Sequence, residues 1–407
     1  MSFVSIKRHP ERIAYILIFN NMLFAMAMDI HLPSMPIMVR DLQTTEFMVQ
    51  LVLIFFAFGA IFSRLLWGPV SDLYGRRKIM LLTIGIQTAG QLGCSLAPNI
   101  ETLITIRAIQ SFGAGISSVL GTAIIADLFS HRTERARILG LLEMSFPIAF
   151  VLAPIIGAVL VEATGGWRAN FILILFFCIV AWILVYKYIP ETHIPKKNER
   201  TTILFKTYFK LLQHVKFVSY SAMVGIVVAT YMMFVINAPF IYISDFGLSV
   251  STYAIYQFIP MLFNMFSVLV YRHVVNLFGI SKCARYGIAA LTSMIPIYFI
   301  IGLLNYKWPA EVILTIICLQ SAIVPFIIPG FTAKALDKFP DIKGMSSSAI
   351  GSIRSICTSF GMFFGSYVVG SNFEDLFITM GSMLIIVAIM YWSFHVKEFQ
   401  YGASRHK

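Results

Sequence analysis

The chain has 407 residues, of which 58% are hydrophobic and only 12% are charged. Soluble proteins carry about 25% charged residues, so this composition excludes an ordinary soluble domain and predicts a protein embedded in lipid. The net charge of +12 could indicate a nucleic-acid partner, but the basic residues are distributed as the loops of a membrane protein require, and we expect no nucleic acid to bind.

Apolar segments long enough to cross a bilayer as helices follow one another along the whole chain. They are continuously apolar rather than alternating, which favours helices over a β-barrel. The first is followed directly by a second and lacks a small-residue cleavage site, so we interpret it as a span and not as a signal peptide. The twelve predicted spans are residues 13–35, 46–67, 79–97, 102–129, 137–162, 169–189, 217–243, 251–275, 283–304, 310–332, 344–370 and 373–395.

Basic residues gather on one side of these spans. With an even number of spans both termini share a side, and that side receives the terminal basic residues and those of every second loop. The opposite side has only Arg40, Arg168 and Lys307. The positive-inside rule therefore predicts a multi-pass protein with both termini in the cytoplasm.

A basic break in the hydropathy divides the chain into two halves. We predict an N-terminal six-helix bundle at residues 1–190, a cytoplasmic linker at 191–216 and a C-terminal six-helix bundle at 217–407. In the linker, Leu204 and Tyr208 share one helical face, which indicates either a short helix at the membrane interface or a partly ordered connection.

A short repeat supports the division into halves. Residues 276–279 read Asn-Leu-Phe-Gly and echo Asp-Leu-Tyr-Gly at residues 72–75, at an offset of 204 residues. Both copies follow an even-numbered span. Parallel repeats of this kind are typical of transporters that bind a substrate between their halves.

Charged residues inside spans are costly and are functional candidates. Asp29 lies 17 residues after Arg12, about 25 Å along the helix, and Arg107 lies six residues after Glu101, about 9 Å from the outer end of its span. The two residues therefore share a depth and could face one cavity. An aspartate opposed by an arginine there could exchange a proton for a substrate; the alternative is a static ion pair.

Two further carboxylates could carry protons. Glu143 lies in the inner part of the fifth span, and Asp127 lies at the cytoplasmic end of the fourth. For Asp127 we favour a different role, in which it pairs with Arg76 in a cytoplasmic gate.

The loop after the second span carries the most specific pattern. Residues 67–80 read Trp-Gly-Pro-Val-Ser-Asp-Leu-Tyr-Gly-Arg-Arg-Lys-Ile-Met, and this segment resembles motif A of the major facilitator superfamily of secondary transporters. The resemblance assigns a gating role to Gly68, Asp72, Gly75, Arg76 and Arg77, and it implies that Asp72 faces the start of the eleventh span.

Three other segments are similar to motifs of drug:proton antiporters of the Bcr/CflA type. Residues 29–33 read Asp-Ile-His-Leu-Pro, similar to the Asp-x-x-Leu-Pro signature of the first helix, although His31 stands where an aromatic residue is usual. Arg107 and Gln110 resemble motif B. Motif C is represented by Ala153, Pro154 and Gly157, which would kink the fifth span and allow close packing.

The resemblance implies an all-α membrane protein of twelve helices in two pseudo-symmetric six-helix bundles. It implies a proton-coupled antiporter that exports amphipathic small molecules, such as antibiotics, across the bacterial inner membrane by alternating access. The alternatives are a transporter of the same fold for a dedicated metabolite (a siderophore, sugar or amino acid) and a non-transporting receptor or scaffold. We expect no enzymatic activity, no cofactor beyond the proton gradient, and a functional monomer whose partners are substrate, protons and the lipid bilayer.

We predict a substrate cavity lined by polar, aromatic and methionine side chains of three spans and by one lone arginine. Such a lining suits amphipathic ligands. Asn20 and Asn21 stand where some multidrug antiporters carry a glutamate. Because this second carboxylate is missing there, we expect proton coupling to depend more on Asp29. Neither the cysteines nor the histidines have metal-ligand spacing. The candidate cavity residues are Asn20, Asn21, Met26, Tyr231, Met233, Asn237, Tyr256, Gln257, Asn264 and Arg354.

Overall fold

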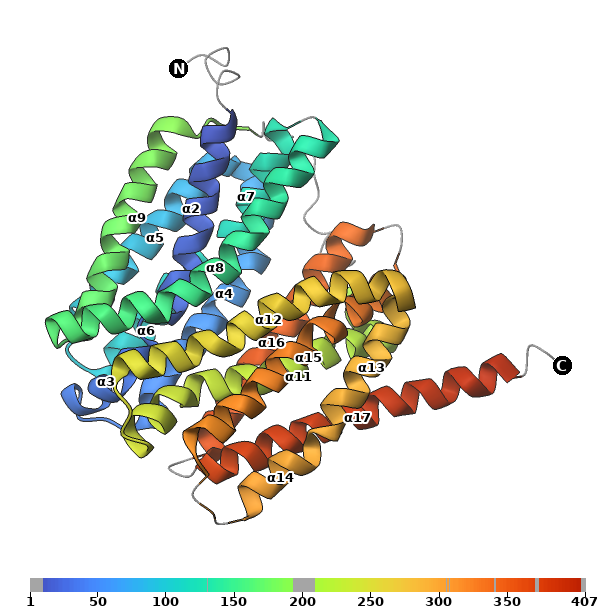
Figure 1. Ribbon diagram of the computed structural model, residues 1–407. Coiled ribbons are helices and arrows are strands. Elements are labelled where there is room, and N and C mark those ends of the chain that lie inside the picture. The colour runs from blue at the N-terminus through green and yellow to red at the C-terminus, as the bar shows by residue number, and fades with distance from the viewer. Residues whose placement is uncertain are drawn as a thin grey trace. The chain divides into compact units, whose positions relative to one another are not determined.

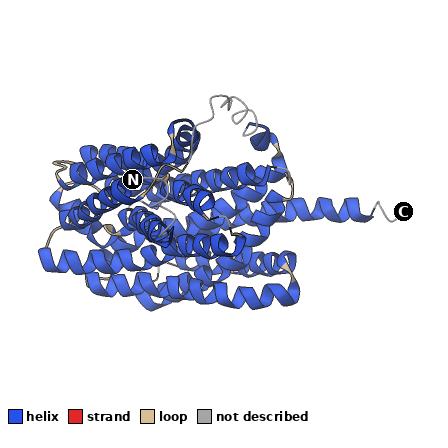
Figure 2. Ribbon diagram, turned by 90° about the horizontal axis from the view of Figure 1, so that it is seen from above, coloured by secondary structure: helices blue, strands red, loops and turns tan. Residues whose placement is uncertain are grey.

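The computed structural model describes residues 10–129, 131–192, 209–304, 306, 308–339, 342–369 and 373–403. Every regular element in these ranges is helical (Figure 2). The predicted spans all coincide with helices or with pairs of helices, as the sequence predicts for an all-α membrane protein.

Within the described residues, the regular elements of the first half of the chain are all helical, and Figure 1 labels the α-helices in chain order. They are α2 (Pro10–Asp29), the 3₁₀ turn η1 (Leu32–Ser34), α3 (Met35–Asp41), α4 (Glu46–Tyr74), α5 (Arg76–Ser95), α6 (Ile100–Ala114), α7 (Ser117–Leu128), α8 (Arg132–Thr164) and α9 (Arg168–Tyr188). Side-chain caps define two of the starts, because Thr45 accepts a hydrogen bond from the Met48 amide at 3.3 Å and Asn99 accepts one from the Thr102 amide at 2.9 Å.

The second half begins at α11 and contains a π-helical turn. Most of the predicted linker, residues 193–208, lies outside the described residues, and with it Leu204 and Tyr208 of the expected interfacial helix. The elements are α11 (Val215–Pro239), the π-turn η2 (Phe240–Asp245), α12 (Val250–Phe278), α13 (Ile280–Ser293), α14 (Ile295–Leu303), α15 (Ala310–Leu336), α16 (Lys343–Val369) and α17 (Phe373–Ala403).

The chain separates into two compact units. One consists of Met1–Thr201 with Gly247–Ile255, and the other of Thr202–Phe246 with Tyr256–Lys407. The packing inside the two units follows one scheme: α2 packs on α8 and α9 in the first, and α11 packs on α16 and α17 in the second. Likewise α5 packs on α6 and α9, while α13 and α14 pack on α15 and α17. The repeated scheme is what two copies of one helical bundle would produce.

Ten helical segments among the described residues are long and apolar enough to cross a membrane by length and composition. The two predicted spans outside this set are α5 and α16. In α5 the polar residues Thr83, Gln87 and Gln91 lower the mean hydropathy. All three are buried inside the unit and therefore do not face lipid.

Several predicted spans are two helices with a break between them. The fourth span is α6 followed by α7, with the break at Gly115 and Ile116. A side chain at Gly115 would overlap the backbone of Ala60, so close packing against α4 explains why a glycine stands at the break. In the ninth span the break precedes Pro296, which cannot donate to the helix ladder.

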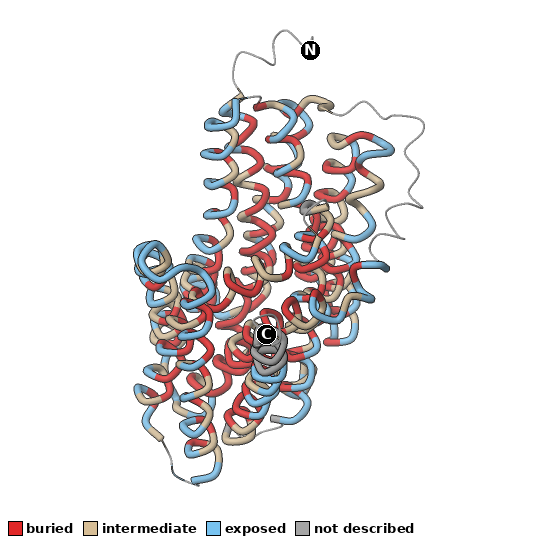
Figure 3. The backbone as a smooth tube through the Cα atoms, turned by 90° about the vertical axis from the view of Figure 1, so that its right-hand side faces the viewer, coloured by how far each residue is buried: buried red, intermediate tan, exposed pale blue. Residues whose placement is uncertain are grey.

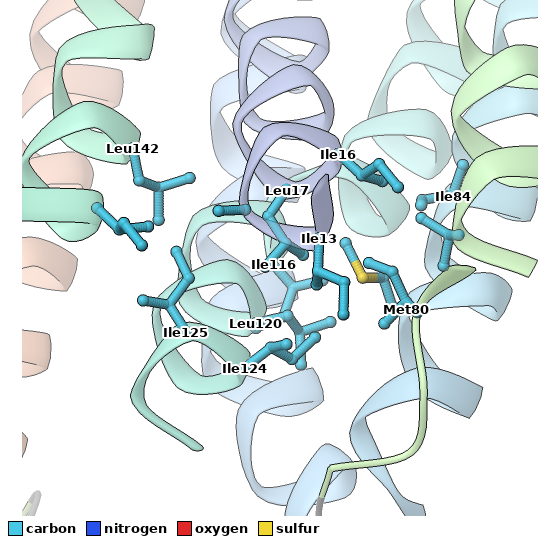
Figure 4. Packing of buried hydrophobic residues seen from close by; sticks show 14 of the residues in the cluster. Ile13, Ile16, Leu17, Met80, Ile84, Ile116, Leu120, Ile124, Ile125 and Leu142 are labelled. Atoms are coloured by element: carbon cyan, nitrogen blue, oxygen red, sulfur yellow. The ribbon is translucent and has the colours of Figure 1, made fainter. Parts of the chain in front are cut away.

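A hydrophobic cluster joins the start of α2 to the end of α7. Ile13 and Leu17 of α2 pack with Met80 of α5, Leu120 of α7 and Leu142 of α8 (Figure 4). In Figure 3, buried residues (red) recur along the helices, with exposed residues (pale blue) between them. Because this cluster fixes the register of α2 against its neighbours, it also fixes the depth at which the polar end of α2 lies.

Candidate functional site

Asp29 is the last residue of α2 and is 1% exposed. Its Oδ2 atom forms no hydrogen bond with the described part of the chain. The carbonyl of the next residue, Ile30, packs so closely on α8 that a side chain in place of Gly157 would overlap it. The motif C glycine and the candidate proton carrier therefore belong to one contact, in which α8 lies directly on the backbone beside Asp29.

His31 lies in the turn that follows Asp29 and is fully buried. Its ring stacks on Phe171 of α9, with centroids 5.8 Å apart. Neither ring nitrogen forms a hydrogen bond within the described residues. The sequence comparison with the antiporters marked this histidine only as a departure, and the structure places it beside the acid.

Arg107 is fully buried on α6 and holds three helices together. Its Nη1 donates to the Ala27 carbonyl at 2.9 Å and to Gln110 Oε1 at 3.2 Å, and its Nε donates to the Val52 carbonyl of α4 at 3.4 Å. Ala27 lies in the last turn of α2, where carbonyls lack helical partners and a positive charge is favourable. The structure thus gives Arg107 and Gln110 of motif B a direct contact.

Asp29 and Arg107 lie in one buried cluster but do not pair directly. The charge of Arg107 acts electrostatically on Asp29 and on His31, yet no ion pair joins Asp29 to it within the described residues. The shared depth inferred from helix lengths agrees with this placement. The expected pair is replaced by hydrogen bonds from the guanidinium to backbone carbonyls, because the free end of α2 competes with the carboxylate for the same donors.

A stack of phenylalanines fills the space between α2, α4 and α8. Phe24 stacks on Phe56 at 5.7 Å between centroids and on Phe146 at 6.0 Å. The Arg107 guanidinium lies 4.1 Å from the Phe56 centroid, and the Arg64 guanidinium lies 5.9 Å from that of Phe24. Two arginines therefore flank one aromatic stack, each in cation–π contact.

Sequence reasoning missed Arg64. The predicted span at residues 46–67 contains Arg64 near its end, but the candidates drawn from the sequence do not include it. The helix in fact continues to Tyr74, so the signal that could have found Arg64 is the helix-compatible stretch from Gly68 to Tyr74.

The motif A loop is closed by charge contacts around Arg76. Its Nη1 contacts Asp127 of α7 and donates to the Ala123 carbonyl at 2.7 Å. The pairing of Arg76 with Asp127 that the sequence predicted is therefore confirmed. Asp72 lies 3.9 Å from the same guanidinium, while Gly68 has open space around it and Gly75 adopts a φ of 99°, which a side chain would strain.

Glu191 caps the helix that follows motif A. Its Oε1 accepts hydrogen bonds from the backbone amides of Arg76 at 2.8 Å and Arg77 at 3.4 Å, the first residues of α5. The free amides of a helix start favour a carboxylate there. A side chain at Gly75 would overlap this carboxylate. The resemblance placed Glu191 in a family segment without giving it a role, and the structure makes it the acceptor that joins the end of the first bundle to motif A.

The remaining candidates of the first unit are mostly buried. Asn21 donates to the Leu142 carbonyl at 3.2 Å and to Ser145 Oγ at 2.9 Å, which ties α2 to α8. Asn20 and Met26 are buried in α2, and Ala153 and Pro154 are buried in α8. Glu143 is exposed on α8.

The candidates of the second unit differ in their contacts and in their exposure. Three of them are engaged in or between helices: Asn237 donates to the Met233 carbonyl at 2.8 Å, Met233 packs against Gly365, and Asn264 donates to the Ser321 carbonyl at 2.9 Å. The others differ in exposure: Gln257 is buried, Tyr231 and Tyr256 are half-buried, and Arg354 is exposed on α16. Among the described residues no three His, Cys, Asp or Glu side chains lie together in a way that could hold a metal ion.

Comparison with known proteins identifies the family. Residues 17–362 match the Major Facilitator Superfamily. A bicyclomycin resistance protein homolog of Haemophilus influenzae is 26% identical over 387 residues, which cover 91% of this chain and 93% of that protein. Multidrug resistance protein D of Escherichia coli is 32% identical over 186 residues, which cover 45% of this chain and 46% of that protein.

Solved structures agree on the fold. A D-xylose–proton symporter superimposes with a TM-score of 0.71 over 95% of this chain and 98% of that chain, at 15% identity. This likeness supports the arrangement of helices alone. Because the family match spans most of the chain and the apolar helices follow the same fold, the chain belongs to the Major Facilitator Superfamily and is a multi-pass membrane transporter rather than an enzyme.

Proposed function

We propose that this protein exports amphipathic small molecules, antibiotics among them, across the bacterial cytoplasmic membrane in exchange for protons. One observation carries the proton part of the proposal: the carboxylate of Asp29 is buried in the same cluster as Arg107, and within the described residues no ion pair joins the two. The names of the bicyclomycin and multidrug resistance relatives support the choice of substrates.

Asp29 is the proton carrier in this proposal. Its carboxylate takes up a proton when it faces the side of high proton concentration and gives it up when substrate binds nearby. Arg107 is held by three acceptors of the protein, so it stays in place as a fixed positive charge while Asp29 changes its charge. Substrate and proton then compete for one deprotonated site, which is the condition for exchange.

Motif C lets α8 move with the proton carrier. At Gly157, α8 packs directly on the backbone of Ile30. A conformational change in the turn at Asp29 would therefore displace α8. Packed contacts of this kind have discrete arrangements rather than a continuous range. We propose that protonation of Asp29 selects between two such arrangements.

Motif A acts as the cytoplasmic gate of the first bundle. Arg76, Asp127 and Glu191 hold the α4–α5 loop to α7 and to the segment after α9. The two bundles are residues 1–190 and 217–407, joined by the linker 191–216, with both termini in the cytoplasm. The bundles rock against each other in a functional monomer, and the proton gradient is the energy source.

The test compares Asp29→Asn with Asp41→Asn, an aspartate that is exposed at the end of α3. Each variant is expressed in drug-sensitive cells and reconstituted in proteoliposomes with an imposed pH gradient. Asp29→Asn should insert normally and lose gradient-driven export, while Asp41→Asn should export like wild type. Export by Asp29→Asn at the wild-type rate would overturn the proposal.

A further inference from the structure

His31 is a fully buried histidine in the turn between α2 and η1, two residues after the proton carrier Asp29. Within the described residues neither of its ring nitrogens forms a hydrogen bond, and Asp29 Oδ2 forms none either. Buried polar groups without a partner are costly, and a role in chemistry is one of the reasons for which native proteins keep them. The turn therefore holds an acid and an imidazole that both have unused hydrogen-bonding capacity.

The backbone of His31 is fixed in place. Its carbonyl accepts hydrogen bonds from Ser34 Oγ at 2.7 Å and from the Ser34 amide at 3.0 Å. Asn170 Nδ2 donates to Ser34 Oγ at 3.5 Å, which ties the turn to α9. The imidazole stacks on Phe171 of the same helix, with centroids 5.8 Å apart. These contacts hold the residue by its backbone and by the face of its ring, so both nitrogens are left to accept or release a proton.

Packing alone does not account for a histidine at this position. The stack on Phe171 uses only the face of the ring, which a phenylalanine would supply without polar atoms that need partners. Histidine is the side chain that takes up and releases protons most readily near neutral pH, and it can gain a proton at one nitrogen while it loses one at the other. The residue type therefore favours a role in proton transfer.

Arg107 sets the electrostatics of both groups. Its charge acts on Asp29 and on His31, and its guanidinium lies 5.7 Å from the centroid of the Phe171 ring on which His31 stacks. A proton on His31 would add a second positive charge near Arg107 and would be repelled, whereas the carboxylate of Asp29 would attract it. His31 is thus suited to pass a proton on rather than to hold it.

The elements packed around the turn offer few other charged groups. Between Glu143 and Glu162, α8 has no titratable side chain, and the α9 residues that contact the turn, Asn170 and Phe171, do not titrate. Asp29 is therefore the acid nearest to His31 along the chain. The remaining charged or titratable groups on the surrounding helices are Cys94 of α5, Arg107 of α6, Arg168 at the start of α9, and Arg40 and Asp41 at the end of α3.

We infer that His31 is the proton-transfer partner of Asp29. In the state that opens to the outer side, one ring nitrogen takes a proton from water and forms an N–H bond. The N–H bond of the other nitrogen then breaks, and its proton forms an O–H bond with the Asp29 carboxylate. His31 is again a neutral imidazole, and Asp29 is a neutral acid. The inference rests on the proposed function, because it adds a second residue to the proton path of the same exchanger.

The experiment follows protonation of Asp29 in purified full-length protein after a rapid drop in pH, by time-resolved infrared spectroscopy. The band of the protonated carboxyl group is identified by its loss in Asp29→Asn. His31→Gln should reach the same final band intensity as wild type, because the acid remains. It should reach that intensity at least about a hundredfold more slowly, which is the usual contribution of a positioned proton-transfer group.

Two further variants separate proton transfer from packing. His31→Phe keeps a ring to stack on Phe171 and removes both nitrogens, so it should be as slow as His31→Gln. His214 provides the matched control, because its ring also packs on a phenylalanine, Phe339, at 5.3 Å between centroids, and its Nδ1 accepts a hydrogen bond from the Phe217 amide at 3.2 Å. His214→Gln keeps a side-chain acceptor and should protonate Asp29 at the wild-type rate.

A wild-type rate in His31→Gln would overturn the inference, and so would a wild-type rate in His31→Phe, which would mean that the ring only packs on Phe171. An equal loss of band intensity and rate in both variants would also overturn it, because His31 would then support the structure of the turn rather than transfer protons. Failure of the proposed function has a separate sign: wild-type protein would show no carboxyl band that Asp29→Asn removes, and His31 would have no acid to serve.

Discussion

The contact between Gly157 and Ile30 makes the sharpest prediction about the link between motif C and Asp29. In Gly157→Ala the new methyl group would overlap the carbonyl oxygen of Ile30. That atom belongs to the backbone and cannot rotate away, so α8 must move outward or the turn beside Asp29 must shift. Overpacking of this kind costs about 1–3 kcal/mol.

The magnitude translates into a loss of transport. If the cost falls on the transport-competent state, the rate should drop about fivefold to a hundredfold, since about 1.4 kcal/mol corresponds to a factor of ten. The assay is the initial rate of export driven by a pH gradient in proteoliposomes, together with the thermal unfolding midpoint in detergent. We expect the rate and the midpoint both to fall.

Gly140 provides the control on the same helix. A side chain at Gly140 meets nothing within 4 Å, so Gly140→Ala should keep the wild-type rate and should stabilise the helix by about 0.5–1 kcal/mol. Together the two variants separate a local clash from a general intolerance of α8 to alanine. A wild-type rate and midpoint for Gly157→Ala would refute the argument that this contact couples α8 to Asp29.

Two further predictions concern the gate and the fixed charge. Glu191→Ala removes the acceptor of the Arg76 and Arg77 amides and should lower stability by about 0.5–2 kcal/mol; an unchanged unfolding midpoint would show that the cap is dispensable. Arg107→Lys should bind substrate more weakly and recover only part of the export rate, because an ammonium cannot reach the carbonyls of both Ala27 and Val52; wild-type export by this variant would count against the role given to the guanidinium.

The positions of the spans could be predicted because long apolar runs leave few alternatives. The ends of the helices could not, since they depend on local backbone geometry. The helix α4 continues past Trp67 to Tyr74 and stops only where Gly75 adopts a positive φ. Hydropathy does not report backbone geometry, so it placed the end of this helix too early and Arg64 too close to that end.

The sequence predicted which residues belong to the candidate site but not all of the contacts that they make. Helix length alone placed Asp29 and Arg107 at one depth, and charge complementarity paired Arg76 with Asp127. The partner of Arg107 could not be predicted, because the competing acceptor is a backbone carbonyl at Ala27 that carries no sequence signal. The cap by Glu191 likewise depends on where the chain passes after α9.

The central claim is that Asp29 exchanges a proton for substrate, and proton release from purified protein tests it most directly. When a transported substrate is added to weakly buffered wild-type protein, the account predicts that protons are released and that the substrate binds more tightly as pH rises, because binding favours the deprotonated acid. Asp29→Asn should release no protons and should bind with an affinity that does not change with pH. If this variant releases protons as wild type does, Asp29 is not the coupled site, and Glu143 or Asp127 becomes the better candidate.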